Sequence, residues 1–166
     1  MTVMAQPPGP KDGRKANRRG AARLAAVQAL YQMDIAGTGS NEILAQFESH
    51  WIGREVEGNQ YLPAEAAFFR DVVGGVVREQ RTLDPLIDAV LEQSWPLKRI
   101  ETILRAILRA GAFELMELAD VPPRVIISEY IDVAHAFFEG DEPRVVNGVL
   151  DSLARKLRPG DLPERG

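Results

Sequence analysis

Residues 100–115, IETILRAILRAGAFEL, decide the fold class. Their apolar positions recur every three or four residues, which is the spacing of one face of an α-helix. The apolar face is wide, so we expect this helix to be central, to begin at Pro96 and to be the longest in the chain. Gly111 lies in the face and marks a point where another helix can approach closely. The apolar positions are Ile100, Ile103, Leu104, Ile107, Leu108 and Leu115.

The helical period continues on both sides of this stretch, and no segment alternates apolar and polar residues as a half-buried strand would. Helix-capping residues, glycines and prolines divide the chain into about seven predicted helices, with a predicted loop at Gly53–Leu62. The predicted fold is therefore all-α, with short loops between helices. The predicted helices begin at about Lys15, Ser40 or Asn41, Pro63, Thr82 or Asp84, Pro96, Asp120 with Pro122 and Pro123, and Asp141 or Glu142.

The composition is that of a globular protein of one domain, or of two small subdomains that share a core. Hydrophobic residues make up 45% of the 166 residues, which is enough for a buried core. The absence of cysteine excludes disulfides and thiolate metal sites and fits a cytoplasmic protein. No apolar run is long enough to span a bilayer, and the N-terminus lacks the apolar segment of a secretory signal.

Both ends of the chain are predicted to be tails. Residues 1–13 are rich in proline and glycine and have little to bury, so we expect a disordered basic tail there. Residues 159–166 form a second predicted tail. The helical domain then occupies residues 14–158.

The sequence offers no candidate active site. Its acidic residues fall mostly on the polar faces of the predicted helices, where solvated side chains are the ordinary case. The pair Gly74–Gly75 lacks the GxxxxGKS/T spacing of a phosphate loop. His50 and His135 are far apart and have neither a neighbouring nucleophile nor ligand spacing. We therefore expect a protein that is not an enzyme and carries no metal or cofactor.

Charge is distributed unevenly along the chain. Residues 1–23 hold six basic side chains and one acidic one, a net charge of +5, whereas the rest holds 14 basic and 23 acidic side chains, a net charge of −9. Together they give the −4 of the whole chain. A basic arm on an acidic body suggests a polyanionic partner, most simply nucleic acid. The alternative is a solvated tail that only aids solubility.

The predicted first helix gives part of this arm a regular arrangement. Arg19, Arg23 and Tyr31 follow one another at multiples of four residues, so they can share one side of the helix. Guanidinium groups bind phosphate through two hydrogen bonds, and a tyrosine ring can stack on an RNA base. Arginines near a helix N-terminus are unfavourable without an anion. A tyrosine on an apolar stripe is, however, more often a core residue.

Five blocks of this chain resemble those of the NusB family in order and spacing, over about residues 15–159. VNGVLD at 146–151 is the most specific segment. The blocks are RRGAARLAAVQALYQMD at 18–34, FFRDVVGGV at 68–76, ILRAGAFEL at 107–115, DVPPRVIISEYIDVAHAF at 120–137 and VVNGVLDSLARKLRP at 145–159.

The resemblance implies a fold of two packed three-helix subdomains and a role in transcription antitermination. NusB proteins bind the single-stranded boxA element of ribosomal RNA operons together with NusE, a small-subunit ribosomal protein, within the transcription elongation complex. By position, the resemblance places Asp141 beside a partner site. The residues expected to contact RNA are Arg14, Lys15, Arg18, Arg19, Arg23, Tyr31, Phe137, Arg144 and Asn147.

Two positions depart from the family pattern. Gly20 and Ala21 stand where the family can be more basic, and Val145 stands where it often has phenylalanine. Valine cannot stack on a base, so an aromatic contact at that position is lost. Asn147 also has a purely structural alternative, because an asparagine near a helix start can bond only to backbone.

Other interpretations stay open at this point. One is a helical adaptor or a self-associating protein whose basic tail is incidental, and a homodimer that masks its RNA-facing surface belongs with it. Another is the NusB-like domain that precedes a methyltransferase in ribosomal RNA methylation enzymes, although the chain has no cysteine nucleophile. A helical DNA regulator is a further alternative.

Overall fold

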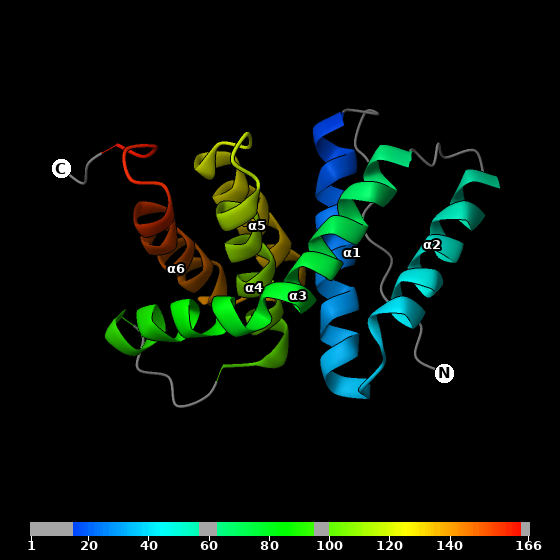
Figure 1. Cartoon of the computed structure of the whole chain (residues 1–166), viewed down its shortest axis with the longest axis horizontal. Coiled ribbons are helices and arrows are strands. Elements are labelled where there is room, and N and C mark those ends of the chain that lie inside the picture. The colour runs from blue at the N-terminus through cyan, green and yellow to red at the C-terminus, as the bar shows by residue number, and fades with distance from the viewer. Residues whose placement is uncertain (1–14, 57–62, 95–99, 164–166) are drawn as a thin grey trace. The chain divides into compact units, whose positions relative to one another are not determined.

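The computed structural model describes residues 15–56, 63–94 and 100–163, and every regular element in these ranges is an α-helix (Figure 1). The prediction of an all-α fold is confirmed. No helix within these ranges is long and apolar enough to cross a membrane. The helices are α1 (Lys15–Ala36), α2 (Ser40–Val56), α3 (Pro63–Ser94), α4 (Thr102–Glu117), α5 (Pro123–Phe137) and α6 (Glu142–Leu157).

The described ranges hold six helices, and not the seven predicted, because two of the expected helices are one. The helix beginning at Pro63 continues through the expected break at Thr82–Asp84 and ends at Ser94. Pro85 lies inside it and removes one backbone hydrogen bond, which typically costs about 3 kcal/mol. Burial outweighs this cost, since the apolar stripe passes the proline without changing its helical period. Its fully buried members include Val72, Val76, Leu83 and Ile87.

Two further boundary predictions were wrong. The helix α2 continues through Gly53 to Val56, so the first part of the expected loop is helical, and residues 57–62 lie outside the described ranges. The helix α4 begins at Thr102 and not at Pro96, with Glu101 in extended backbone before it. It is also shorter than α3, which has 32 residues. The expected tail at residues 1–13 lies outside the described ranges as well.

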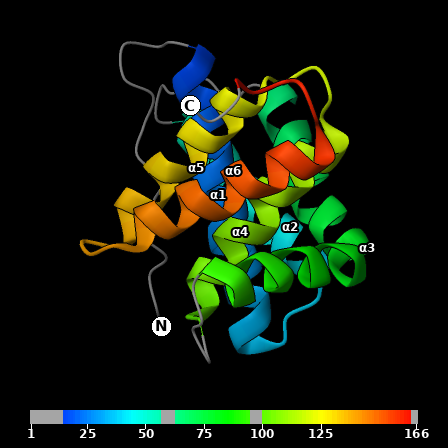
Figure 2. The ribbon, with the colours of Figure 1, turned by 90° about the vertical axis from the view of Figure 1, so that its left-hand side faces the viewer.

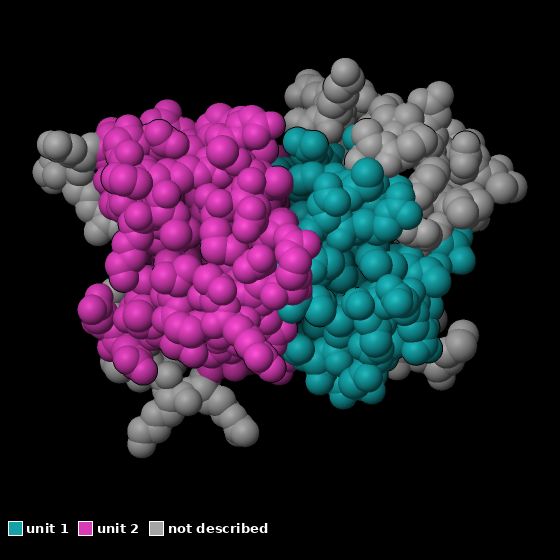
Figure 3. Space-filling view, viewed as in Figure 1, with its two compact units in different colours: residues 1–77 teal, residues 78–166 magenta. Residues whose placement is uncertain are grey.

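The chain divides into two compact units, Met1–Val77 and Arg78–Gly166 (Figure 3). The first contains α1, α2 and the N-terminal part of α3, and the second contains the remainder of α3 with α4, α5 and α6. The resemblance implied two packed three-helix subdomains; the structure divides the chain into two units, and α3 contributes to both.

The core of the first unit is formed where three helices meet. The rings of Phe47 on α2 and Phe69 on α3 stack with their centroids 5.4 Å apart. The predicted apolar stripe of α1 is buried at Leu24, Val27 and Leu30. Burial of these aromatic and aliphatic side chains is the main stabilising term for such a helical unit.

The core of the second unit is formed by α4, α5 and α6, which all contact one another. Figure 2 shows α5 and α6 side by side. A Cβ atom at Gly111 would lie only 2.7 Å from Leu150 Cδ1, so the glycine lets α6 approach α4 closely. The predicted close approach at Gly111 is therefore confirmed, and α4 is buried along almost its whole length, as its wide apolar face predicted.

Ion pairs attach the C-terminal part of α3 to α4 within the second unit. The guanidinium of Arg109 donates two hydrogen bonds of 2.8 Å to the carboxylate of Asp84. Arg105 donates a bond of 2.9 Å to Asp88 one turn further along α3. Only 10% of the Arg109 side chain is exposed, so its two-pronged bond is protected from solvent screening.

Candidate nucleic-acid interface

The predicted RNA-contacting residues fall into two groups, one in each unit. The first group lies on α1 and the second lies around the junction of α5 and α6. Arg14 lies outside the described residues, and Lys15 and Arg18 belong to α1 without described side chains. The first group thus has three described side chains: Arg19, Arg23 and Tyr31.

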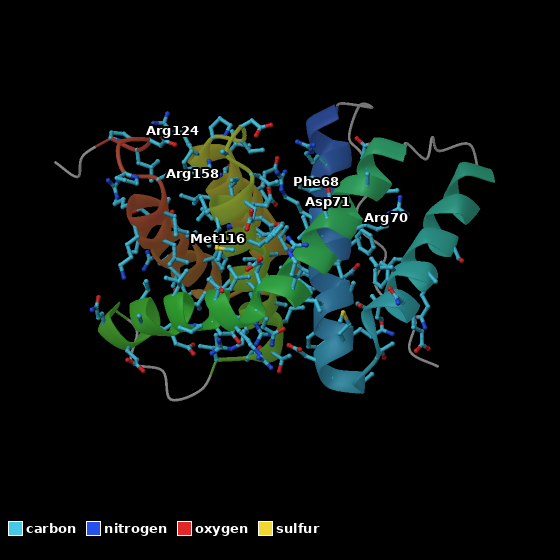
Figure 4. All side chains as sticks on the ribbon, in the orientation of Figure 1. Phe68, Arg70, Asp71, Met116, Arg124 and Arg158 are labelled. Carbon is cyan, nitrogen blue, oxygen red and sulfur yellow. The ribbon has the colours of Figure 1, made fainter. Side chains whose placement is uncertain are left out.

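Arg19 and Arg23 converge on the ring of Phe68, which comes from α3 and is labelled in Figure 4. The guanidinium carbon of Arg19 lies 4.4 Å from the ring centroid, and that of Arg23 lies 5.0 Å from it. Both distances are within the range of about 6 Å over which a cation is attracted to an aromatic face. The ring therefore holds two positive charges of α1 close together.

The start of α1 offers Arg19 no compensating negative charge. The first turn of α1 contains no acidic residue, and the positive end of the helix dipole lies there. Arg19 and Arg23 are four residues apart, a spacing at which like charges repel on a helix. Arg19 is exposed and forms no ion pair within the described residues. An external anion such as a phosphate would therefore be favoured beside Arg19.

Arg23 differs from the sequence-based expectation because only 2% of it is exposed. Its guanidinium lies inside the protein against Phe68 and is not exposed to solvent. Direct phosphate contact by Arg23 stays a prediction that requires this side chain to move. Sequence spacing alone cannot distinguish an inward-facing arginine from an outward-facing one.

Tyr31 is exposed, but it does not share one line with Arg19. A helix turns by about 100° per residue, so each step of four residues adds about 40°. Over three such steps Tyr31 is rotated by about 120° from Arg19 and lies about 18 Å further along the axis. The buried Arg23 and Val27 stand between them. The expectation that all three residues share one side of the helix is therefore wrong. Residues only four positions apart, such as Arg19 and Arg23, are still neighbours along it.

The exposure of Tyr31 nevertheless removes the core interpretation of this residue. It is 37% exposed, and Ile35, one turn further on, is 60% exposed. More than a third of Tyr31 is thus accessible at this end of α1, and base stacking requires such access.

The second group lies where α5 ends and α6 begins. Phe137 is the last residue of α5 and is half-buried, and Asp141 is the exposed N-cap residue of α6 without a side-chain capping bond. Arg144 and Asn147 follow on α6 and are both exposed. They are three residues apart, so their side chains project from the same side of the helix.

Arg144 and Asn147 are both available to a ligand. Neither side chain forms a hydrogen bond or ion pair with any residue that the structure describes. The alternative in which Asn147 only bonds to backbone is therefore not seen here. Val145 between them is half-buried, which is consistent with a packing role.

Sequence reasoning missed one member of the first group, Phe68. It lies in the FFRDVVGGV block, but its pairing with α1 joins residues more than forty positions apart. No local spacing signals such a contact. The described residues contain no cluster of three or more His, Asp or Glu that could hold a metal ion. The two groups instead offer guanidinium, amide and aromatic surfaces, which are the chemistry of nucleic-acid recognition.

A family model described as "NusB family" matches residues 20–155 of this chain. The chain belongs to the NusB family. As a member of this family, the chain is a transcription antitermination factor. Similar proteins are named transcription antitermination protein NusB. The transcription antitermination protein NusB of Rhodopseudomonas palustris (strain HaA2) is 70% identical over 155 residues, which cover 93% of this chain and 92% of that one. The NusB of Bradyrhizobium sp. (strain ORS 278) is 68% identical over 149 residues, covering 90% and 89%.

Solved structures of NusB proteins have the same fold. The T. maritima NusB superimposes with a TM-score of 0.71 at 28% identity, over 85% of this chain and 93% of that one. The NusB of a crystal structure of the antitermination factors NusB and NusE with double-stranded RNA superimposes with a TM-score of 0.69 at 24% identity, over 84% and 96%.

Proposed function

We propose that this NusB-family factor binds the single-stranded boxA element of ribosomal RNA operons together with NusE. In the cytoplasm, as part of the transcription elongation complex, the bound pair would promote antitermination by RNA polymerase. The observation that carries the proposal is Arg19, an exposed guanidinium held over Phe68 without an acidic partner among the described residues.

The chemistry of each described residue suits one part of RNA binding. Arg19 and Arg144 are exposed cations that can each hold a phosphate, because guanidinium matches its oxygens through two bonds. Tyr31 offers a ring for stacking on an unpaired base, and Phe137 offers a second ring that is half-buried. Asn147 has an exposed amide that can accept from and donate to a base edge.

The comparison with solved structures supports the choice of partners. One structure of similar fold contains NusB with NusE and RNA, and its RNA is described as double-stranded. Preference for single-stranded boxA is therefore part of the proposal and needs a duplex competitor in its test.

A gel shift with four RNA conditions tests this function directly. We expect the full chain to retard a boxA oligoribonucleotide, and to do so at lower protein concentration when NusE is added. A scrambled single strand and a boxA duplex should both bind more weakly. Equal binding of all three RNAs would reject boxA recognition.

Replacing Arg19 with alanine should weaken boxA binding about tenfold, which is the loss expected for a charge-assisted phosphate contact. The slope of log affinity against log salt should also become less steep by about 0.7, because one phosphate contact to a single strand is lost. Fluorescence anisotropy at several salt concentrations measures both quantities. Arg81→Ala removes an exposed arginine from α3 and is the matched control. An unchanged slope in Arg19→Ala would remove Arg19 from the interface.

Self-association is the second candidate function, favoured by the exposed Tyr31 and Ile35 at the end of α1. Adjacent exposed apolar side chains can mark a protein contact, and a homodimer formed there would cover Tyr31. Sedimentation with and without boxA RNA separates the two functions. A dimer that dissociates when RNA is added fits a masked RNA surface, whereas a dimer that ignores RNA fits an adaptor.

A further inference from the structure

Phe68 is a core residue that touches two cations of another helix. Its ring is 5% exposed, so its position is fixed by the packing of the first unit. The guanidinium carbons of Arg19 and Arg23 lie 4.4 and 5.0 Å from its centroid. A rigid ring thus contacts two side chains that would otherwise be long and flexible.

The contact changes what Arg19 can do for a ligand. A free arginine samples many rotamers and loses this freedom when it binds a phosphate. A guanidinium already held over a ring has lost part of that freedom before a ligand arrives. Pre-ordering of this kind improves affinity without adding a contact.

Arg23 contacts the same ring from a position four residues further along α1. Two cations four residues apart on a helix repel each other, and the negative face of the ring offsets part of that repulsion. Arg23 is 2% exposed, so its charge stays beneath the surface where Arg19 is displayed. The ring thus contacts both arginines, and Arg19 is the one that a ligand can reach.

We propose that Phe68 is a positioning residue for RNA binding: its ring pre-orders Arg19 to receive an RNA phosphate. Phe68 acts through the arginines, since its own burial keeps it from the RNA. The proposal rests on the proposed function and adds a residue that no arginine-rich motif contains.

The test compares two leucine variants of adjacent phenylalanines. Phe68→Leu keeps an apolar side chain in the core and removes the aromatic face beneath the arginines. Phe69→Leu is the matched control, because Phe69 is fully buried one residue further on and stacks on Phe47. Both variants lose a core ring, so a general cost of lost packing appears in both. Circular dichroism at the assay temperature shows that each variant is folded.

The free protein gives the first measurement. Protons held over an aromatic face resonate upfield, so the side-chain signals of Arg19 should be shifted upfield in the wild type. In Phe68→Leu these signals should move towards their random-coil positions, and the Arg19 Nε–H group should become more mobile. In Phe69→Leu they should stay where they are. Unchanged Arg19 signals in folded Phe68→Leu would overturn the proposal without reference to RNA.

RNA affinity gives the second measurement, with boxA oligoribonucleotide as the probe. Phe68→Leu should bind about three- to fivefold more weakly than the wild type, and Phe69→Leu should bind like it. The double variant Arg19→Ala/Phe68→Leu should bind only slightly more weakly than Arg19→Ala, because the two residues act through one contact. Fully multiplicative effects of the two substitutions would overturn the proposal.

The results also separate this inference from the proposed function. If wild-type protein binds boxA and Arg19→Ala weakens it, but Phe68→Leu behaves like Phe69→Leu, only the role of Phe68 is refuted. If wild-type protein does not bind boxA RNA with or without NusE, both are refuted.

Discussion

Replacing Arg158 with alanine should lower the free energy of unfolding by about 3 kcal/mol, the largest effect we expect from a single substitution. For a chain of this size the melting temperature should fall by about 10 °C. Chemical denaturation followed by circular dichroism measures the first quantity, and a thermal melt measures the second. The reason is that the buried guanidinium of Arg158, which follows α6, donates hydrogen bonds to carbonyls at the C-terminal end of α4.

Arg158 follows α6 and reaches back to the C-terminal end of α4. Its Nε donates to the Leu115 carbonyl at 2.8 Å, and one terminal nitrogen donates to the Glu114 carbonyl at 3.0 Å. The carbonyls of Leu118 and Val121, in the turn that leads to α5, accept from the same guanidinium. Helix-end carbonyls have no partner within the helix, and a cation there is favoured by the helix dipole. Alanine would leave the Leu115 and Val121 carbonyls without this donor, while the Glu114 and Leu118 carbonyls would keep their backbone donors, the N–H groups of Leu118 and Val121.

Arg124→Ala is the matched control, because Arg124 is an exposed arginine of α5 in the same unit (Figure 4). Its loss should change the free energy of unfolding by less than about 0.5 kcal/mol. Arg158→Lys should recover only a small part of the stability, since an ammonium cannot reproduce the planar array of donors. Equal stability of Arg158→Ala and Arg124→Ala would show that the hydrogen bonds of Arg158 contribute no net stability.

The helices were predictable because burial in this protein follows a helical period. The stripe through Leu104, Ile107 and Leu108 predicted α4, and a cap signal at Asp141 predicted the start of α6. Both signals can be read from neighbouring residues, although the Asp141 side chain forms no capping hydrogen bond in the structure. Gly111 was predictable for the same reason, as a small residue in an otherwise large apolar face.

The helix break predicted near Pro85 was wrong because packing against residues distant in sequence outweighed the local signals for a helix end. The Thr82–Asp84 cap and the proline favour a break, yet Leu83 and Ile87 are fully buried on either side of it. The pairing of Asp84 with Arg109 also depends on α4, which is distant in sequence. Tertiary packing therefore determines that α3 is one helix, and no window of sequence contains that information.

The sequence predicted which kinds of side chain would form the candidate site, but not which of them would be exposed. Charge asymmetry and family resemblance pointed to the arginines of α1, and Arg19 is exposed as expected. The burial of Arg23 and its contact with Phe68 depend on how α3 packs on α1, which spacing along α1 cannot reveal. Arg19 is exposed and Arg23 is buried because of the way the helices of the first unit pack together.

A buried hydrogen bond inside the second unit can be removed to measure how much it stabilises that core. The hydroxyl of Tyr130 on α5 donates to a carboxyl oxygen of Glu114 on α4, and both residues are fully buried. Glu114 also provides a backbone carbonyl to Arg158, so its neighbourhood joins three segments of the unit. A buried polar group is costly when its partner is removed, because water cannot replace the lost bond.

Replacing Tyr130 with phenylalanine should therefore lower the free energy of unfolding by about 2 kcal/mol while leaving the helical content unchanged. The midpoint of urea denaturation should fall and the slope should stay the same, since the folded state loses a bond and not its compactness. Tyr31→Phe removes the same hydroxyl from an exposed tyrosine and should cost less than about 0.5 kcal/mol. Similar midpoints for the two variants would mean that the Tyr130 hydroxyl contributes no net stability. A large difference would establish that this buried bond, and not tyrosine hydroxyls in general, holds α5 against α4.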